Sequence, residues 1–122
     1  MTTSESTSTT WPWPPELDAM VAAPAHHTLL FENDAVRVLD AHVEPGETVP
    51  VHTHRWPSVL YLLSASDFVR RDPEGNVLLD TRGTPHAAVG SVSWDPPLTP
   101  HSLENVGSAQ MRSIMVELKH GE

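Results

Sequence analysis

Prolines divide this chain into short segments. Twelve of its 122 residues are proline, and proline inside a helix removes a hydrogen bond and clashes with the preceding turn, which argues against an all-helical bundle. The length is about that of one small domain. We therefore expect one domain built mainly from strands and turns.

The strand patterns begin at residue 28. Short apolar or alternating runs are separated by turn sequences such as Pro45-Gly46 and Gly83-Thr84-Pro85, which is typical of strands joined by tight turns. The expected strands cover residues 28–32, 36–43, 49–54, 58–64, 67–71, 77–81, 91–94 and 112–118. Eight short strands predict an all-β sandwich or barrel.

The first fifteen residues differ from the rest of the chain. Eight of the first ten are Ser or Thr, so ordering this segment would bury little apolar surface, and we expect a flexible or extended N-terminal arm over residues 1–15. Trp11 and Trp13 either anchor this arm, on its own barrel or on a partner subunit, or leave it free. Residues 16–122 form the expected domain, and residues 16–23 predict a short helix that stops before Pro24.

The charge and the missing cysteines exclude several classes of protein. The net charge is −9 with only 7 Lys and Arg, so no basic patch is available for nucleic acid or for an anionic membrane surface. Without cysteine there are no disulfides, no Cys-ligated zinc and no thiolate nucleophile. No signal peptide is visible, and the longest strongly apolar run, residues 59–63, is too short to span a bilayer. A cytoplasmic protein is expected.

Eight histidines outnumber the lysines and arginines. His52 and His54 stand two apart in the extended stretch VPVHTH, and side chains two apart in a strand point to the same face. This pair predicts either a metal chelate or two histidines that face solvent.

The wider spacing resembles the two sequence motifs of the cupin superfamily. The first motif spans residues 46–65 and the second spans residues 90–105. The matched positions are Gly46, His52, His54, Gly90, Pro96, His101 and Asn105. The resemblance covers residues 35–118 and implies a double-stranded β-helix, a jelly-roll barrel. It also implies that His52, His54 and His101 hold one divalent metal ion.

The chain departs from the cupin motifs at Ala65 and Leu98, where glycines are usual, and at Ser58, where cupins carry a glutamate ligand. No Asp or Glu lies between Glu47 and Asp67 to replace it. We therefore expect a site of three histidines without a carboxylate, whose uncompensated positive charge favours an anionic ligand.

The resemblance implies a metal-dependent enzyme that acts on a small anionic or enolisable molecule, with dioxygenase-like chemistry on iron(II). Zinc, nickel or copper would also suit three imidazoles. Two alternatives remain: a zinc-type cyclase, isomerase or lyase, and a non-catalytic module that binds a metal or a small molecule. No obvious general base accompanies the histidines, so an enzyme is favoured only slightly.

Other side chains have narrower possible roles. Tyr61 and Ser58 are the candidates for catalysis, and Trp56-Pro57 forms either a pocket wall or a packed turn. Asn105 is expected to brace the turn of the second motif. Three arginines would meet a substrate carboxylate if they pointed inward, although alternation favours the outside: Arg37, Arg55 and Arg112. The remaining histidines are expected at the surface or in turns: His26, His27, His42, His86 and His120. A homodimer is expected, paired through edge strands or exchanged arms.

Overall fold

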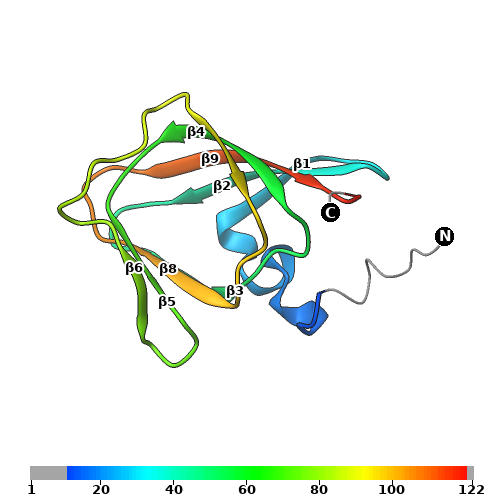
Figure 1. Ribbon diagram of the computed structural model, residues 1–122, viewed down its shortest axis with the longest axis horizontal. Coiled ribbons are helices and arrows are strands. Elements are labelled where there is room, and N and C mark those ends of the chain that lie inside the picture. Colours follow the sequence, from blue (N-terminus) through cyan, green and yellow to red (C-terminus); the bar gives the residue numbers. More distant parts are fainter. Residues whose placement is uncertain (1–10, 121–122) are drawn as a thin grey trace.

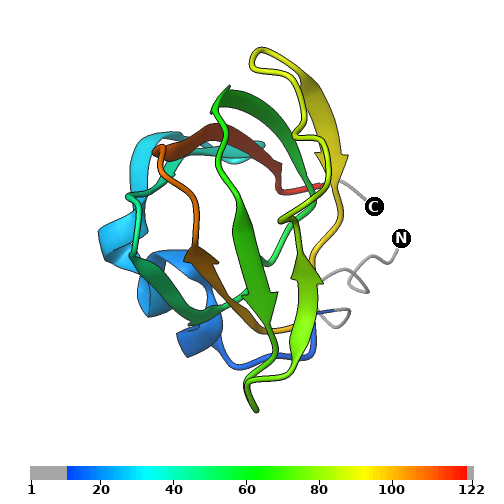
Figure 2. The ribbon, with the colours of Figure 1, turned by 90° about the vertical axis from the view of Figure 1, so that its left-hand side faces the viewer.

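The computed structural model describes residues 11–120. Within these residues, nine strands form two antiparallel sheets that face each other (Figure 1). The five-stranded sheet has the order β1-β2-β9-β4-β7 and the four-stranded sheet the order β3-β8-β5-β6; the smaller sheet is seen with its strands side by side in Figure 2. The predicted double-stranded β-helix is confirmed.

The strands have these bounds: β1 His27–Glu32, β2 Val36–Val43, β3 Thr48–His52, β4 Ser58–Ser64, β5 Phe68–Arg71, β6 Val77–Asp80, β7 Val92–Asp95, β8 His101–Asn105 and β9 Met111–Leu118. Eight of them overlap the strands expected from the sequence, and β8 was not expected. In β8 the residues of one face are His101, Leu103 and Asn105. Only one of these three is apolar, so the strand lacks the apolar alternation that identifies strands in a sequence.

The expected helix over residues 16–23 is divided into the 3₁₀-helix η1 (Pro15–Leu17) and the α-helix α2 (Ala19–Ala22). It ends before Pro24 as expected, and a separate 3₁₀-helix, η2 (Pro24–His26), follows. The break falls at Asp18, whose backbone is extended and whose side chain caps α2 by accepting a hydrogen bond from the Met20 N–H. Among residues 11–120, no helix has the length and apolar character needed to cross a membrane.

The interior between the sheets is more polar than is usual for a small domain. A compact apolar cluster consists of Ala23, Val43 and Val49, with Leu103 and Met111 packed against it. Much of the remaining buried volume is occupied by histidine, arginine and carboxylate side chains. Buried polar groups are costly unless they are paired, so their arrangement indicates the location of the functional site.

The turn after β8 is held by Asn105, which is fully buried. Its amide nitrogen donates to the carbonyl oxygens of Val43 and Ala109, and its amide oxygen accepts from the Ser66 hydroxyl and the Gly107 N–H. Both N–H donors and both oxygen lone pairs of this side chain are therefore used. Asn105 braces the turn as the sequence predicted.

Candidate metal centre

Four imidazole rings lie close together inside the barrel. His27, His52 and His54 each offer a ring nitrogen, and these nitrogens lie within 4.8 Å of one another. The fourth ring, that of His101, has its centroid 4.7 Å from that of His52. We call these four residues the histidine cluster.

Strand register explains how distant parts of the chain meet here. His52 at the end of β3 lies directly opposite His101 at the start of β8, and the pairing of β3 with β8 is irregular just before this point. His54 follows two residues later, and His27 is the first residue of β1. The irregularity matters because a bulge turns side chains toward a site that regular pairing would miss.

Each ring of the cluster is held through its Nδ1 atom. The Nδ1–H groups of His27, His52 and His101 donate to backbone carbonyl oxygens, at 2.9, 2.8 and 2.7 Å respectively. The acceptors are Ala23, Pro50 and Thr99. A carbonyl oxygen only accepts, so the hydrogen must sit on Nδ1 of each neutral ring, and the Nε2 lone pair is left free.

Burial keeps these rings neutral. It lowers the pKa of His27 and of His101 to about 4 each. Burial, reinforced by the nearby His101, lowers the pKa of His52 to about 2. Neutral imidazoles with a fixed Nδ1–H and a free Nε2 are the form in which histidine binds metals. The donor set therefore fits a divalent transition-metal ion.

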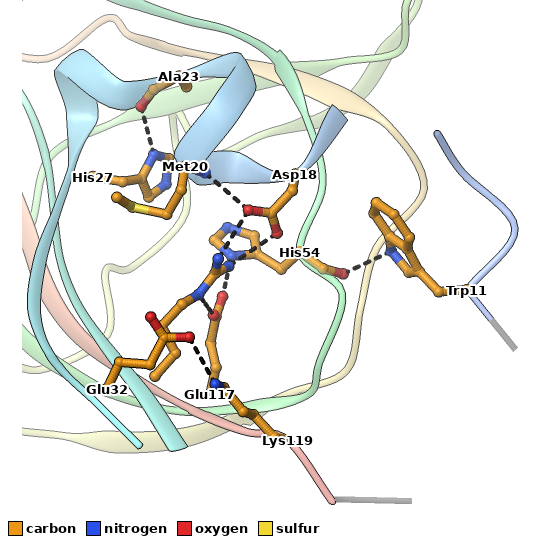
Figure 3. Close-up of polar contacts among 10 residues, drawn as sticks. Trp11, Asp18, Met20, Ala23, His27, Glu32, His54, Glu117 and Lys119 are labelled. Atoms are coloured by element: carbon orange, nitrogen blue, oxygen red, sulfur yellow. Dashed lines mark hydrogen bonds and ion pairs between the residues drawn. The ribbon is translucent and has the colours of Figure 1, made fainter. Parts of the chain in front are cut away.

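The fourth ring is held by a carboxylate in place of a carbonyl. Nδ1 of His54 donates to Oε2 of Glu117 at 2.5 Å, and Glu117 is completely buried on β9. Oε1 of Glu117 accepts from Nε of Arg37, also at 2.5 Å. Arg37 in turn donates twice to Asp18, at 2.9 Å each. Figure 3 shows the side chains of Asp18, His54 and Glu117 directed toward one another beside the short helix.

This buried chain of contacts carries a net negative charge when His54 is neutral, because it contains two carboxylates and one guanidinium. Burial opposes ionisation of Asp18 and of Arg37, but their mutual hydrogen bonds prevail, so the pKa of Asp18 stays below its usual value and that of Arg37 stays above it. A buried negative charge next to His54 favours a cation on the far side of the ring.

A cavity of about 380 Å³ opens on the histidine cluster and is walled by residues of both sheets. Its apolar walls include Leu60, Phe68 and Met115, and Trp56 and Ser58 also face it. This volume is within the range typical of small-molecule sites.

The sequence matches no protein-family model and none of the curated proteins. Solved structures do match. A cupin domain from Bordetella pertussis is 20% identical, with 76% of this chain and 91% of that chain covered and a TM-score of 0.61. An RmlC-like cupin family protein from Methanocaldococcus jannaschii is 14% identical, with 77% and 79% covered and a TM-score of 0.55.

The chain has the cupin fold. A third match, the polyketide cyclase RemF from Streptomyces resistomycificus, is 19% identical, with 77% of this chain and 64% of that chain covered and a TM-score of 0.51. At these identities the similarity establishes the fold alone.

Within this cupin barrel the sequence-predicted ligands are close together, but the set differs from the expected one. The nitrogens of His52 and His54 are grouped with that of His27, which was expected at the surface or in a turn and is instead 5% exposed. The predicted ligand His101 lies next to His52 but is not one of these three residues. His26 is also buried, with its Nδ1 donating to the His42 carbonyl oxygen. His27 lies outside both cupin motifs, so motif spacing carried no signal for it.

The two candidates for catalysis lie on opposite faces of β4. Ser58 is buried and faces the cavity, whereas Tyr61 is 44% exposed and is not part of the cavity wall. Because they stand three positions apart in one strand, alternation places them on opposite sides. Tyr61 therefore lies away from the cavity.

The carboxylate that is missing at Ser58 is present on the neighbouring strand. Ser58 on β4 lies opposite Glu117 on β9. Glu117 is not grouped with the histidine nitrogens but bonds the back of His54. The expectation that no carboxylate would offset the charge of a bound ion is therefore wrong. The carboxylate of Glu117 bonds the side of the His54 ring opposite to Nε2, the atom that would hold the ion.

The three arginines considered from the sequence have other partners. Arg37 points inward, to Asp18 and Glu117, and Arg112 lines the cavity while paired with Asp40. Arg55 lies over the rings of Trp11 and Trp56. A fourth arginine, Arg70, also lies in the cavity wall, and no sequence pattern distinguishes it.

The arm expected over residues 1–15 is described only from Trp11 onward, and its first ten residues lie outside the described part of the chain. The indole N–H of Trp11 donates to the His54 carbonyl oxygen at 3.1 Å. Trp11 therefore anchors the arm on its own barrel.

Proposed function

We propose that this protein is a metal-dependent enzyme acting on a small anionic or enolisable molecule, with the metal held by Nε2 atoms of the histidine cluster. The observation that carries the proposal is that all four rings donate Nδ1–H to an acceptor, which leaves Nε2 free on the neutral rings of His27, His52 and His101. Buried neutral imidazoles with free Nε2 atoms are expensive to desolvate without a ligand.

A divalent ion in this place supplies Lewis-acid polarisation of a carbonyl or enolate oxygen. The protein's own groups orient the ligands and shape the cavity. The backbone carbonyls and Glu117 hold the ring planes, while Leu60, Phe68 and Met115 provide an apolar wall that excludes water from the reacting molecule.

The shared fold favours redox-neutral chemistry. The three close ring nitrogens, those of His27, His52 and His54, would hold a zinc ion and leave it free to polarise a carbonyl or enolate oxygen of the substrate. We therefore place a cyclase, isomerase or lyase first, in accord with the fold shared with a polyketide cyclase. Zinc suits this chemistry without redox change.

The iron(II) dioxygenase suggested by the sequence remains the second candidate. It would use iron(II) on the same three close nitrogens, with His101 beside His52 but outside that group.

The test uses phenylpyruvate, which is anionic, enolisable and small enough for the cavity. Purified protein is analysed for metal, and the keto–enol interconversion of phenylpyruvate is followed by ultraviolet absorbance while an electrode records oxygen. Accelerated interconversion without oxygen uptake, lost in His52→Ala, supports the proposal. Oxygen uptake that depends on iron(II) and on His52 favours the dioxygenase.

The same samples test the metal site and the alternative of a binding module. Equal metal content in the wild type and in His52→Ala would overturn the metal site. Stoichiometric metal that depends on His52, with no activity on phenylpyruvate or on a panel of diketones and phenolic ketones, would favour a non-catalytic binding module over an enzyme.

A further inference from the structure

Arg70 contributes an unpaired positive charge to the cavity wall. It lies on β5, opposite Leu79 of β6 and Leu103 of β8. Its Nε atom is buried without a hydrogen-bond partner, and its guanidinium forms no ion pair with any of residues 11–120. Arg70 is half-buried, and a charged group whose buried N–H has no partner is costly to desolvate.

The guanidinium groups of the other five arginines all have partners within the described residues. Four of them pair with carboxylates: Arg37 with Asp18 and Glu117, Arg71 with Glu104, Arg82 with Asp80 and Arg112 with Asp40. Arg55 instead lies over two indole rings. Arg70 has only the ring of Phe68, 5.6 Å from its central carbon to the ring centroid.

The charge of Arg70 acts on the histidine cluster. After burial, the charge of Arg70 is a further cause that lowers the pKa of His101. Burial lowers the pKa of Arg70 itself, and Asp95, which also lines the cavity, opposes this through its charge without forming an ion pair. The guanidinium and the imidazoles therefore belong to one electrostatic environment.

We propose that Arg70 is the anion-binding residue of the cavity and that its ligand is a small carboxylate whose other end reaches the histidine cluster. This deepens the proposed function, on which it rests for the ligand being the substrate. A guanidinium presents its N–H groups in a planar fork that matches a carboxylate. Leu60, Phe68 and Met115 favour an apolar body between the two polar ends.

The substrate class that follows is a carboxylic acid with an apolar, enolisable body. Arg70 would bind the carboxylate, and the carbonyl or enolate oxygen would face the imidazoles. In this arrangement Arg70 is a binding and positioning residue, and it exchanges no proton with the ligand because a guanidinium stays protonated.

Calorimetric titration of the full chain tests this with phenylacetate as the probe and phenylacetamide as its uncharged counterpart. We expect phenylacetate to bind at least about tenfold more weakly to Arg70→Gln, since a charge-assisted pair is lost. Arg82→Gln makes the same charge change on an exposed residue outside the cavity and should bind like the wild type. Equal affinity of Arg70→Gln and the wild type, or equal affinity for the acid and the amide, would overturn the assignment.

Thermal unfolding separates binding from a structural role. Without ligand, Arg70→Met should melt no lower than the wild type, because the variant removes an unpaired, half-buried charge and keeps much of the length of the side chain. Phenylacetate should raise the Tm of the wild type and leave that of Arg70→Met unchanged. A lower Tm of unliganded Arg70→Met would show that Arg70 supports the fold and would reject the proposal.

Metal analysis of the same samples keeps the two proposals apart. Arg70→Gln should hold as much metal as the wild type, since Arg70 is not a ligand. Arg70-dependent binding of phenylacetate by protein that holds no metal would overturn the metal centre and support the anion site. Normal metal content with binding independent of Arg70 would overturn the anion site alone.

Discussion

Glu117 Oε2 lies 2.5 Å from Nδ1 of His54, and both groups are inside the barrel. The other oxygen of the same carboxylate accepts from Arg37, which Asp18 holds from the opposite side. The orientation of one ring of the cluster therefore depends on three charged residues that would not themselves contact a bound ion.

Glu117→Gln should weaken metal binding by about 10- to 100-fold, the range seen when a partner behind a metal-binding histidine is changed. The amide has the same shape but lacks the charge that favours a cation at His54. Competition with a chromophoric chelator measures the affinity. Glu104→Gln is the control, because Glu104 pairs with Arg71 at the edge of solvent; if both variants bound metal alike, Glu117 would have no part in the site.

Asp18→Ala should lower the free energy of unfolding by about 1.5–3 kcal/mol, because the buried guanidinium of Arg37 loses the hydrogen bonds to Asp18 while Glu117 still balances its charge. Urea denaturation measures this. Asp80→Ala breaks an exposed ion pair with Arg82 and should cost no more than about 1 kcal/mol. Similar losses in the two variants would contradict the role given to the buried pair.

His27→Ala should reduce the metal content of the purified protein as strongly as His54→Ala does. The three-histidine site expected from the sequence predicts no such effect, since His27 is not a member of it. His42→Ala is the matched control, because His42 lies on β2 with its Nε2 3.4 Å from the Thr28 hydroxyl and outside the cluster. Full metal content in His27→Ala would show that His27 is not a ligand and would favour the expected ligands His52, His54 and His101.

The ion pair of Asp40 with Arg112 should make stability depend on pH in the acid range. Hydrogen bonds from Arg112 hold the pKa of Asp40 below its usual value of 3.8. The unfolded chain therefore takes up a proton at a higher pH than the folded protein, so the contribution is present above about pH 4 and is lost as the pH falls through the folded value.

The measurement is the difference in unfolding free energy between the wild type and Asp40→Asn. It should stay constant from pH 7 to pH 5 and shrink toward pH 3. Arg112 is 46% exposed, so added salt should also reduce it. A difference that grows on acidification would show the opposite sign of the pKa shift.

The sequence was informative where the chain repeats a known spacing. Turn residues located eight of the strands, and the motifs selected His52, His54 and His101. Sequence patterns did not predict the residues whose role depends on partners distant in the chain. His27 is 25 positions before His52, and Glu117 bonds a histidine 63 residues away, so neither has a local pattern. Arg70 stands in an ordinary strand sequence, and only the cavity around it shows that it lacks a partner.

The segment before the first strand contributes to the site from outside the barrel. Trp11 bonds the backbone of His54, Asp18 secures Arg37, and the carbonyl of Ala23 fixes His27. Trimming the chain to its β-sheets would keep all nine strands yet release three of these supports at once. The smallest unit that keeps the histidine cluster supported is therefore larger than the smallest unit that defines the architecture, and domain boundaries drawn at the first strand would leave His27, His54 and Arg37 without these contacts.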